Sequence, residues 1–439
     1  MYYRLSFMMF LVYAIPGAWI PVLSIRLERE LCFTPVETGM TFTGWALGAI
    51  LASLIAGQIA DRWLSVEKCI SIFAGMAGIL LLLMAEMVTP WAIILTTFGV
   101  CTFLVPIMTQ SVTLSLRHLD HPETQFGKVR LWGTLGWISA GVLLWAWFRL
   151  PDSVNYWFTF RTELPSFADS MRLAGVMGVF LCLYSFTLPH TPPARKSKTW
   201  LAPLGAIHLL RRRSFAVLVA CFFLMHVSIP FNIQQMSLML KEQIGIPDRW
   251  VSLTLTLAQW SEVFMLFGLG ALTSRMKVKT TLMLGISAWV LWLTVASIGQ
   301  PHWLVVSVLT LNGVFITCFV VRGQVFAGRE AGEDVRASAQ GLITTANGFG
   351  LVIGNLLVGQ VRDYFDRAFS PTFLVGACLA GVAFLLLTVG FEGRAGSLKT
   401  EEEEPAIPVT EEPSLEVPQI TPKVGTDWNA SKEGVPERA

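Results

Sequence analysis

Twelve apolar stretches, each long enough to cross a lipid bilayer, constrain this chain more than any other feature of its sequence. A hydrocarbon core about 30 Å thick needs about 20 helical residues, and a helix satisfies its own backbone hydrogen bonds there. The stretches form two sets of six, with expected bounds 5–27, 38–60, 68–88, 90–115, 131–149, 171–189, 214–240, 250–273, 280–299, 302–328, 338–361 and 371–391. We therefore expect an all-α membrane protein with twelve transmembrane helices.

The composition agrees with a membrane protein and argues against several other classes. Hydrophobic residues make up 54% of the chain and charged residues only 14%, and a soluble protein of 439 residues could not bury so much apolar surface. The net charge of +2 is too small to indicate a nucleic-acid partner. No nucleophile elbow, zinc-protease helix or Walker loop occurs, and the seven cysteines have no metal-like spacing. We expect neither an enzyme nor a bound metal or cofactor.

The chain divides into two related halves. We expect a six-helix bundle at 1–189, a linker at 190–213, a second six-helix bundle at 214–394 and a disordered, acidic cytoplasmic tail at 395–439. Gly57–Arg62 closes the second span much as Gly270–Arg275 closes the eighth, and Val-Arg opens both the fifth and the eleventh spans. The first of these loops resembles the G-x-x-x-D-R loop of the major facilitator superfamily, although an ordinary charged loop is an alternative. Repeated six-helix units that hold a solute near the midplane are typical of secondary transporters.

The distribution of basic residues predicts the orientation in the membrane. With a cytoplasmic amino terminus, the inside segments hold about nineteen Lys and Arg residues and the outside loops about nine. The positive-inside rule then places both termini in the cytoplasm. The expected location is the inner (cytoplasmic) membrane, where lipid surrounds the helices.

A carboxylate lies midway along the eighth span. Glu262 costs several kcal/mol there unless it faces protein or water, and Gln259 shares its helix face at a spacing of three residues. Desolvation favours the neutral form of a carboxyl group, so Glu262 is our candidate for carrying a proton. The alternative is a structural carboxylate that is hydrogen-bonded between helices.

Polar residues on two other spans complete the candidate site. Arg130, Thr134 and Trp137 follow one stripe of the fifth span, at i, i+4 and i+7. Asn232 follows the kinking Pro230 in the seventh span, and its amide can both donate and accept hydrogen bonds. The alternatives are a positive-inside anchor for Arg130, helix packing for Trp137 and interhelical hydrogen bonding for Asn232.

Several strings together resemble the nucleoside:H+ symporter family of the major facilitator superfamily. They are Arg130–Trp137, Thr187–His190, Gln259–Glu262, Val335–Gly341 and Asn347–Gly350. The resemblance implies a twelve-helix permease of two six-helix bundles that takes up nucleosides by alternating access and is driven by protons. It also implies that Arg130, Thr134, Trp137, Asn232, Gln259 and Glu262 are ligands.

The chain departs from the family pattern at two positions. Thr317 stands where relatives carry an acidic residue in the tenth helix, and Val112 stands where relatives tend to have a polar amide. We include Thr317 among the candidate solute ligands. Proton coupling then depends on Glu262, follows another route, or is absent, so that the chain only facilitates diffusion.

The sequence as a whole predicts a monomeric secondary transporter that takes up nucleosides by proton symport. One alternative is a uniporter or antiporter of the same superfamily for another small polar solute, such as a sugar. Another is a membrane sensor that binds its ligand without moving it.

Overall fold

The structure, a computed structural model, describes residues 1–62, 64–150, 166–192 and 202–392, except for the side chains of 49, 51–62, 122–124, 202–206, 269–275 and 332–337. Every regular element in these ranges is helical. The long helices are α1 (Tyr2–Trp19), α3 (Pro35–Arg62), α4 (Val66–Glu86), α5 (Pro90–His118), α6 (Pro122–Trp147), α8 (Ala168–Tyr184), α9 (Arg213–Glu242), α10 (Asp248–Arg275), α11 (Val278–Ile298), α14 (Arg322–Tyr364) and α15 (Phe369–Gly390). The short ones are α2 (Leu23–Ile25), α12 (His302–Ser307) and α13 (Leu311–Phe315).

Three sequence-based expectations lie outside this description. The acidic tail at 395–439 and the part of the linker at 193–201 are not described. The side chains of the related motifs Gly57–Arg62 and Gly270–Arg275, and of Val335 and Arg336, are not described either.

Eleven helices of the described chain are long and apolar enough to cross a membrane. These eleven coincide with eleven of the twelve expected spans. The remaining expected span, 38–60, is covered by α3, most of whose second half has undescribed side chains. An all-helical membrane fold is therefore confirmed, while the number twelve stays a prediction.

Several helix ends follow from local sequence. Pro90 and Pro122 occupy the first position of α5 and α6, where a missing amide hydrogen costs nothing. Gly299 ends α11 with a φ of 73°, a left-handed conformation that glycine adopts without a steric penalty. Pro21 lies in the 3-10 turn Ile20–Val22, which interrupts the first span after α1.

The expected break between the tenth and eleventh spans lies inside α14, whose bounds Arg322–Tyr364 cover parts of both. The chain turns back within this element, because Gln340 Nε2 donates to the carbonyl of Gln324 at 2.7 Å, whereas a straight helix between these residues would span about 24 Å. His302–Ala331 and Ser338–Tyr364 are accordingly two separate candidate membrane spans. The tenth span is irregular at its centre, where Val308–Thr310 is 3-10 helix and Ile316–Val321 is π-helix.

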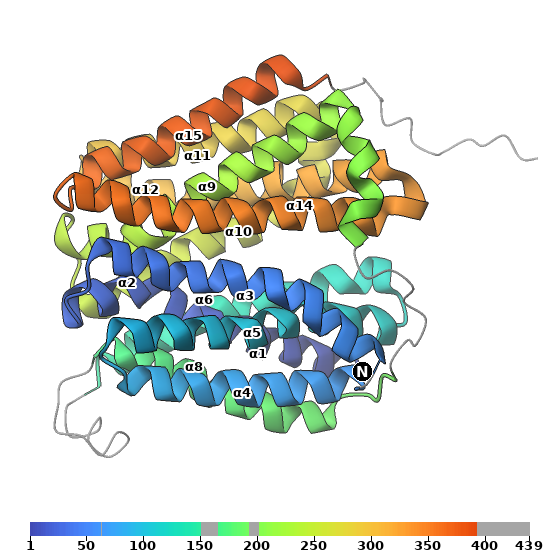
Figure 1. Cartoon of the computed structure of the whole chain (residues 1–439), viewed down its shortest axis with the longest axis horizontal. Coiled ribbons are helices and arrows are strands. Elements are labelled where there is room, and N and C mark those ends of the chain that lie inside the picture. The colour runs from blue at the N-terminus through green and yellow to red at the C-terminus, as the bar shows by residue number, and fades with distance from the viewer. Residues whose placement is uncertain (63, 151–165, 193–201, 393–439) are drawn as a thin grey trace, which may run out of the picture. The chain divides into compact units, whose positions relative to one another are not determined.

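The helices gather into two groups, each with its own core. Figure 1 shows α1–α8 on one side and α9–α15 on the other. We call these the N-terminal and C-terminal groups. One cluster of buried apolar residues draws only on residues from Leu5 to Leu188, and a second only on residues from Leu209 to Phe391. Within each group, packing therefore follows the halves of the sequence.

The two groups touch most closely where α3 meets α14 and where α6 meets α10. At the first contact, a Cβ atom on Gly359 would lie 2.6 Å from the carbonyl oxygen of Pro35, so only glycine allows the helices to come this close. Beyond it, Arg362 Nη2 lies 3.3 Å from Glu28 Oε2, and both side chains are buried. Arg362 also donates to Gln235. We call Glu28, Gln235 and Arg362 the ionic contact.

A small apolar cluster lies at the same end of the molecule. Its buried members are Val22, Ile25, Phe167, Leu238 and Val251, which come from both groups. This end of the interface is therefore closed by apolar packing and by buried charge together.

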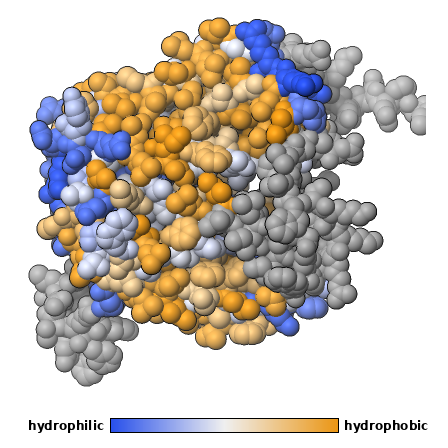
Figure 2. Space-filling view, in the orientation of Figure 1, coloured by the Kyte–Doolittle hydropathy of each residue, from blue (hydrophilic) through white to orange (hydrophobic). Residues whose placement is uncertain are grey.

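The outer surface matches a protein surrounded by lipid. Figure 2 shows hydrophobic residues over most of the visible face and hydrophilic residues gathered toward the ends of the helices. Large apolar side chains with high exposure include Leu95, Phe264 and Val389. Such a band is stable only against hydrocarbon or another apolar surface.

Candidate functional site

A cavity of about 1070 Å³ lies between the two groups of helices. Its wall includes residues of α1 and α6 from the N-terminal group and of α9, α10, α11 and α13 from the C-terminal group. The lining continues to Phe126, Gly127 and Lys128 near the start of α6 and to Gln324 near the start of α14. None of the residues of the ionic contact lines it. The cavity thus extends toward one end of the helices, and the contact closes the other.

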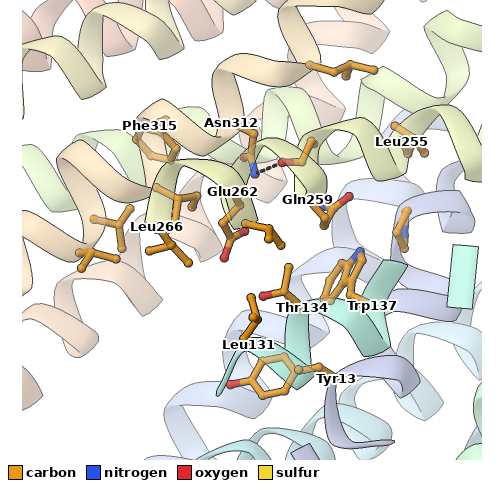
Figure 3. A pocket seen from close by; sticks show the side chains of 18 of the residues that line it. Tyr13, Leu131, Thr134, Trp137, Leu255, Gln259, Glu262, Leu266, Asn312 and Phe315 are labelled. Atoms are coloured by element: carbon orange, nitrogen blue, oxygen red, sulfur yellow. Dashed lines mark hydrogen bonds between the residues drawn. The ribbon is translucent and has the colours of Figure 1, made fainter. Parts of the chain in front are cut away.

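The predicted stripe on α6 faces this cavity. Arg130, Thr134 and Trp137 all line it, because positions four and seven residues apart share one side of a helix. Figure 3 shows Thr134 and Trp137 projecting from α6 into the space below α10. Trp137 also packs against Gly17 of α1, where a Cβ atom would lie 2.8 Å from its ring. Trp137 therefore both packs against α1 and lines the cavity.

Gln259 and Glu262 line the cavity from the opposite group. Their spacing on α10 turns both toward α6, and Figure 3 shows Glu262 directed toward Thr134. A neighbouring helix holds this part of α10 in place. Asn312 of α13 donates to the carbonyl of Ala258 at 3.3 Å, and the amide of Gly313 donates to Ser261 Oγ at 2.9 Å.

The amide side chains of α9 differ in what they contact: two are hydrogen-bonded to α14, and one lines the cavity. Gln234 donates to Asn355 Oδ1 at 2.9 Å and Gln235 accepts from Arg362, so these two join α9 to α14. Asn232 lines the cavity, and its Oδ1 is buried without a hydrogen-bond partner. Gln259 Oε1 is a second unpaired acceptor on the cavity wall. Both oxygens have almost no exposed surface, so a donor in the cavity reaches either of them once its amide side chain turns.

Thr317 does not join the other candidates. It lies in the π-helix Ile316–Val321 with a fully buried side chain, it is absent from the cavity wall, and its hydroxyl has no partner. Its choice as a solute ligand came from aligning the family pattern. The lining positions 312, 316, 320 and 324 follow one another every four residues, so Thr317 lies beside this stripe and is buried in the C-terminal group.

The sequence interpretation missed several lining residues. Tyr13 of α1, Asn312 of α13 and Gln324 of α14 all contribute polar groups to the wall. Trp289 and Trp292 of α11 add aromatic surface. A single tyrosine inside the apolar first span was a usable signal. In the tenth span, Asn312 and Gln324 lie on one stripe with positions 316 and 320, and this spacing of four was a second usable signal.

Charge in the cavity is sparse. Among the lining residues, Glu262 is the one carboxylate, and Lys128 and Arg130 are the two cations. In the described part of the chain, no group of three or more His, Cys, Asp or Glu side chains is arranged to hold a metal ion. The chemistry available here is hydrogen bonding, aromatic stacking and gain or loss of a proton.

Comparison with known proteins identifies similar sequences. The model of the nucleoside H+ symporter family matches residues 1–395. The nucleoside permease NupG of Escherichia coli (strain K12) is 24% identical over 388 residues, which cover 83% of this chain and 88% of that permease. The xanthosine permease of the same organism is 28% identical over 422 residues, covering 89% of this chain and 95% of that permease.

A comparison of structures identifies the same fold. The crystal structure of nucleoside transporter NupG matches with a TM-score of 0.77 at 22% sequence identity, covering 90% of this chain and 99% of that one. A structural match at this identity establishes the helix arrangement alone.

Proposed function

The chain belongs to the nucleoside H+ symporter family, and we propose that its cavity binds one nucleoside and one exchangeable proton and opens alternately to the two faces of the inner membrane. The protein is a multi-pass membrane transporter and not an enzyme. The proposal depends on one observation above all. Two groups of helices turn matched polar and aromatic side chains, Thr134 and Trp137 on one side and Gln259 and Glu262 on the other, into a single cavity.

The wall offers what a nucleoside requires. A heterocyclic base stacks on an aromatic ring, and Trp137 presents one to the cavity. Ribose hydroxyls and base N–H groups are hydrogen-bond donors, and the unpaired oxygens of Asn232 and Gln259 are acceptors. Thr134 supplies a hydroxyl that can donate or accept a hydrogen bond. These residues are the proposed ligands, and Arg130 completes the wall beside them.

Proton coupling is assigned to Glu262. It is the one carboxylate among the cavity-lining residues, and Thr317 replaces the acidic residue of the family at a position that does not reach the wall. A proton changes a conformational equilibrium only if it binds the two conformations differently. Glu262 meets this condition because Arg130 lies on the opposite group, so its distance from Glu262 changes as the groups move.

The two groups are the proposed moving bodies, 1–189 and 214–394, with 190–213 as the linker. Under the predicted topology, with both termini in the cytoplasm, the ionic contact is at the outer end and the cavity extends toward the inner end. The structure then corresponds to a state that is closed to the outside. One chain supplies both walls of the cavity, which supports a monomer surrounded by lipid as the working unit.

The test is uptake of tritiated uridine into proteoliposomes with an imposed pH gradient. Glu262→Gln should abolish accumulation above equilibrium while leaving exchange of uridine at equal pH, because the amide keeps the hydrogen bonds but cannot carry a proton. Glu37→Gln is a matched control, since Glu37 accepts from Thr34 at the start of α3, away from the cavity, and glutamine can do the same. Normal accumulation by Glu262→Gln would exclude the proton role.

A competition panel separates the alternatives. Nucleosides, nucleobases and sugars are each added against one labelled nucleoside. Competition by sugars together with failure of every nucleoside would support a carrier for another polar solute. Binding of nucleoside without exchange would support a sensor.

A further inference from the structure

Arg130 is held by an aromatic ring. Its Cζ atom lies 4.0 Å from the centre of the Tyr13 ring on α1. Among the described residues, no carboxylate lies within 4.0 Å of its guanidinium nitrogens. Arg130 lies in the membrane-spanning part of α6, where a charged side chain needs a partner. The face of a tyrosine ring attracts the cation and leaves the N–H groups of the guanidinium available for other hydrogen bonds.

The contact between Tyr13 and Arg130 depends on the glycine at position 133. A Cβ atom on Gly133 would lie 2.7 Å from Tyr13 Cδ2 and 2.9 Å from Arg130 Nη1. Both side chains therefore occupy the space that any other residue at position 133 would fill. One turn along α6, Gly136 lies against the backbone of Phe10, so α1 and α6 are in close contact over the whole region.

The ring and the cation move together, whereas the carboxylate does not move with them. Tyr13 and Arg130 lie on α1 and α6, which pack within the N-terminal group. Glu262 lies on α10 in the other group and faces the same cavity. Relative motion of the groups changes the separation of Arg130 from Glu262 but preserves its contact with Tyr13.

We propose that Tyr13 is a positioning residue, whose ring holds the Arg130 guanidinium on the N-terminal wall and keeps its N–H donors directed at the cavity. The role builds on the proposed function, because it gives the cation a fixed place from which Glu262 and the solute meet it. Without the ring, the long side chain is free to turn along α6 toward the open end of the cavity. The solute then loses a donor that was already in position.

A chemical measurement tests the placement without any assumption about transport. Phenylglyoxal modifies accessible guanidinium groups, and peptide mass spectrometry of the purified protein reports the rate at Arg130. Tyr13→Leu should raise this rate by roughly 2- to 30-fold, the range expected for loss of a cation–π contact. Tyr13→Phe keeps the ring face and should bring the rate back toward that of the parent protein.

Phe7→Leu is the matched control. Phe7 is an aromatic residue on the same helix that packs against Phe10, Phe180 and Tyr184 and does not line the cavity. Its replacement should leave Arg130 modification unchanged. Gly133→Ala is an independent variant, because its methyl group displaces Tyr13 or Arg130 and should raise the rate as Tyr13→Leu does.

Uridine exchange supplies the functional measurement. Tyr13→Leu should raise KM by roughly 2- to 30-fold with the maximal rate nearly unchanged, and Tyr13→Phe should restore most of the affinity. An unchanged modification rate in Tyr13→Leu overturns the proposal, as does a phenylalanine variant as impaired as the leucine variant. If the parent protein exchanges no nucleoside, the proposed function fails, and the modification rates still decide the role of Tyr13.

Discussion

At the scale of single residues, unpaired polar atoms occur both on the cavity wall and in the packed core. Asn232 and Gln259 each bury an oxygen without a partner, and both side chains line the cavity, so a turn of either amide brings its oxygen to the wall. Thr317 buries an unpaired hydroxyl away from the cavity, where nothing can do so. A buried, unpaired hydroxyl destabilises a protein by about 1–3 kcal/mol. The same defect therefore lies beside the candidate site at two positions and inside the core at the third.

This difference predicts the effect of removing the hydroxyl of Thr317. Thr317→Val is nearly isosteric and should stabilise the detergent-solubilised protein by about 1 kcal/mol or leave its stability unchanged. The KM for uridine should stay the same, since the residue is not on the wall. Thermal unfolding and exchange kinetics measure both quantities. A clear rise in KM would show that Thr317 reaches the solute in another conformation.

At the scale of elements, glycines set how closely helices approach and so where the walls lie. Gly359 of α14 lies against the carbonyl of Pro35 of α3 on the closed side of the interface. Gly381 of α15, by contrast, has no described atom within 4 Å of where its Cβ would be, apart from the neighbouring residues and backbone of its own helix. One glycine serves a contact between the two groups, and the other has free space around it.

These two glycines form a matched pair of tests. Gly359→Ala should destabilise the protein by about 1–3 kcal/mol, because its methyl group overlaps the Pro35 carbonyl and separates α14 from α3. Gly381→Ala should be neutral or stabilising, because alanine favours helix over glycine by about 1 kcal/mol. Unfolding temperatures in detergent give the comparison. Equal temperatures for both variants would mean that α3 and α14 are not held as closely as described.

At the scale of the whole molecule, the two groups are joined by buried charge at one end and separated by a cavity toward the other. Opening the closed end requires the Glu28–Arg362 pair to part. Separating two buried charges is costly unless water enters, so this pair favours the closed arrangement. The ring of Phe369, whose centre lies 4.5 Å from Arg362 Cζ, also attracts the guanidinium through a cation–π contact.

Because both charges of this pair are buried, replacing one of them should destabilise the protein more than replacing both. Arg362→Met leaves Glu28 buried and unpaired and should destabilise the protein by about 3–5 kcal/mol. Adding Glu28→Gln should recover much of the loss. The control is Arg213→Met, which breaks an exposed pair with Glu392 and should cost about 0–1 kcal/mol. If the single and double variants unfold at the same temperature, the pair does not stabilise the interface.

Sequence alone determined the membrane helices and much of the lining of the candidate site, because both depend on local rules. The thickness of a bilayer sets the length of each span, and helical periodicity places Arg130, Thr134 and Trp137 on one stripe and Gln259 with Glu262 on another. Neither rule needs information about distant parts of the chain. The family resemblance added Thr317 to the candidates, and this residue lies off the cavity-lining stripe of the tenth span.

Only the tertiary structure decided which side chains meet. Tyr13 and Arg130 are far apart in the chain, as are Glu28 and Arg362, and no local pattern pairs them. Their contacts follow from how α1 packs on α6 and how α3 packs on α14, which depends on the shapes of whole helices and on single glycines between them. The periodicity of apolar residues predicts which face of a helix a residue occupies. The residue that it contacts there depends on how all the other helices pack.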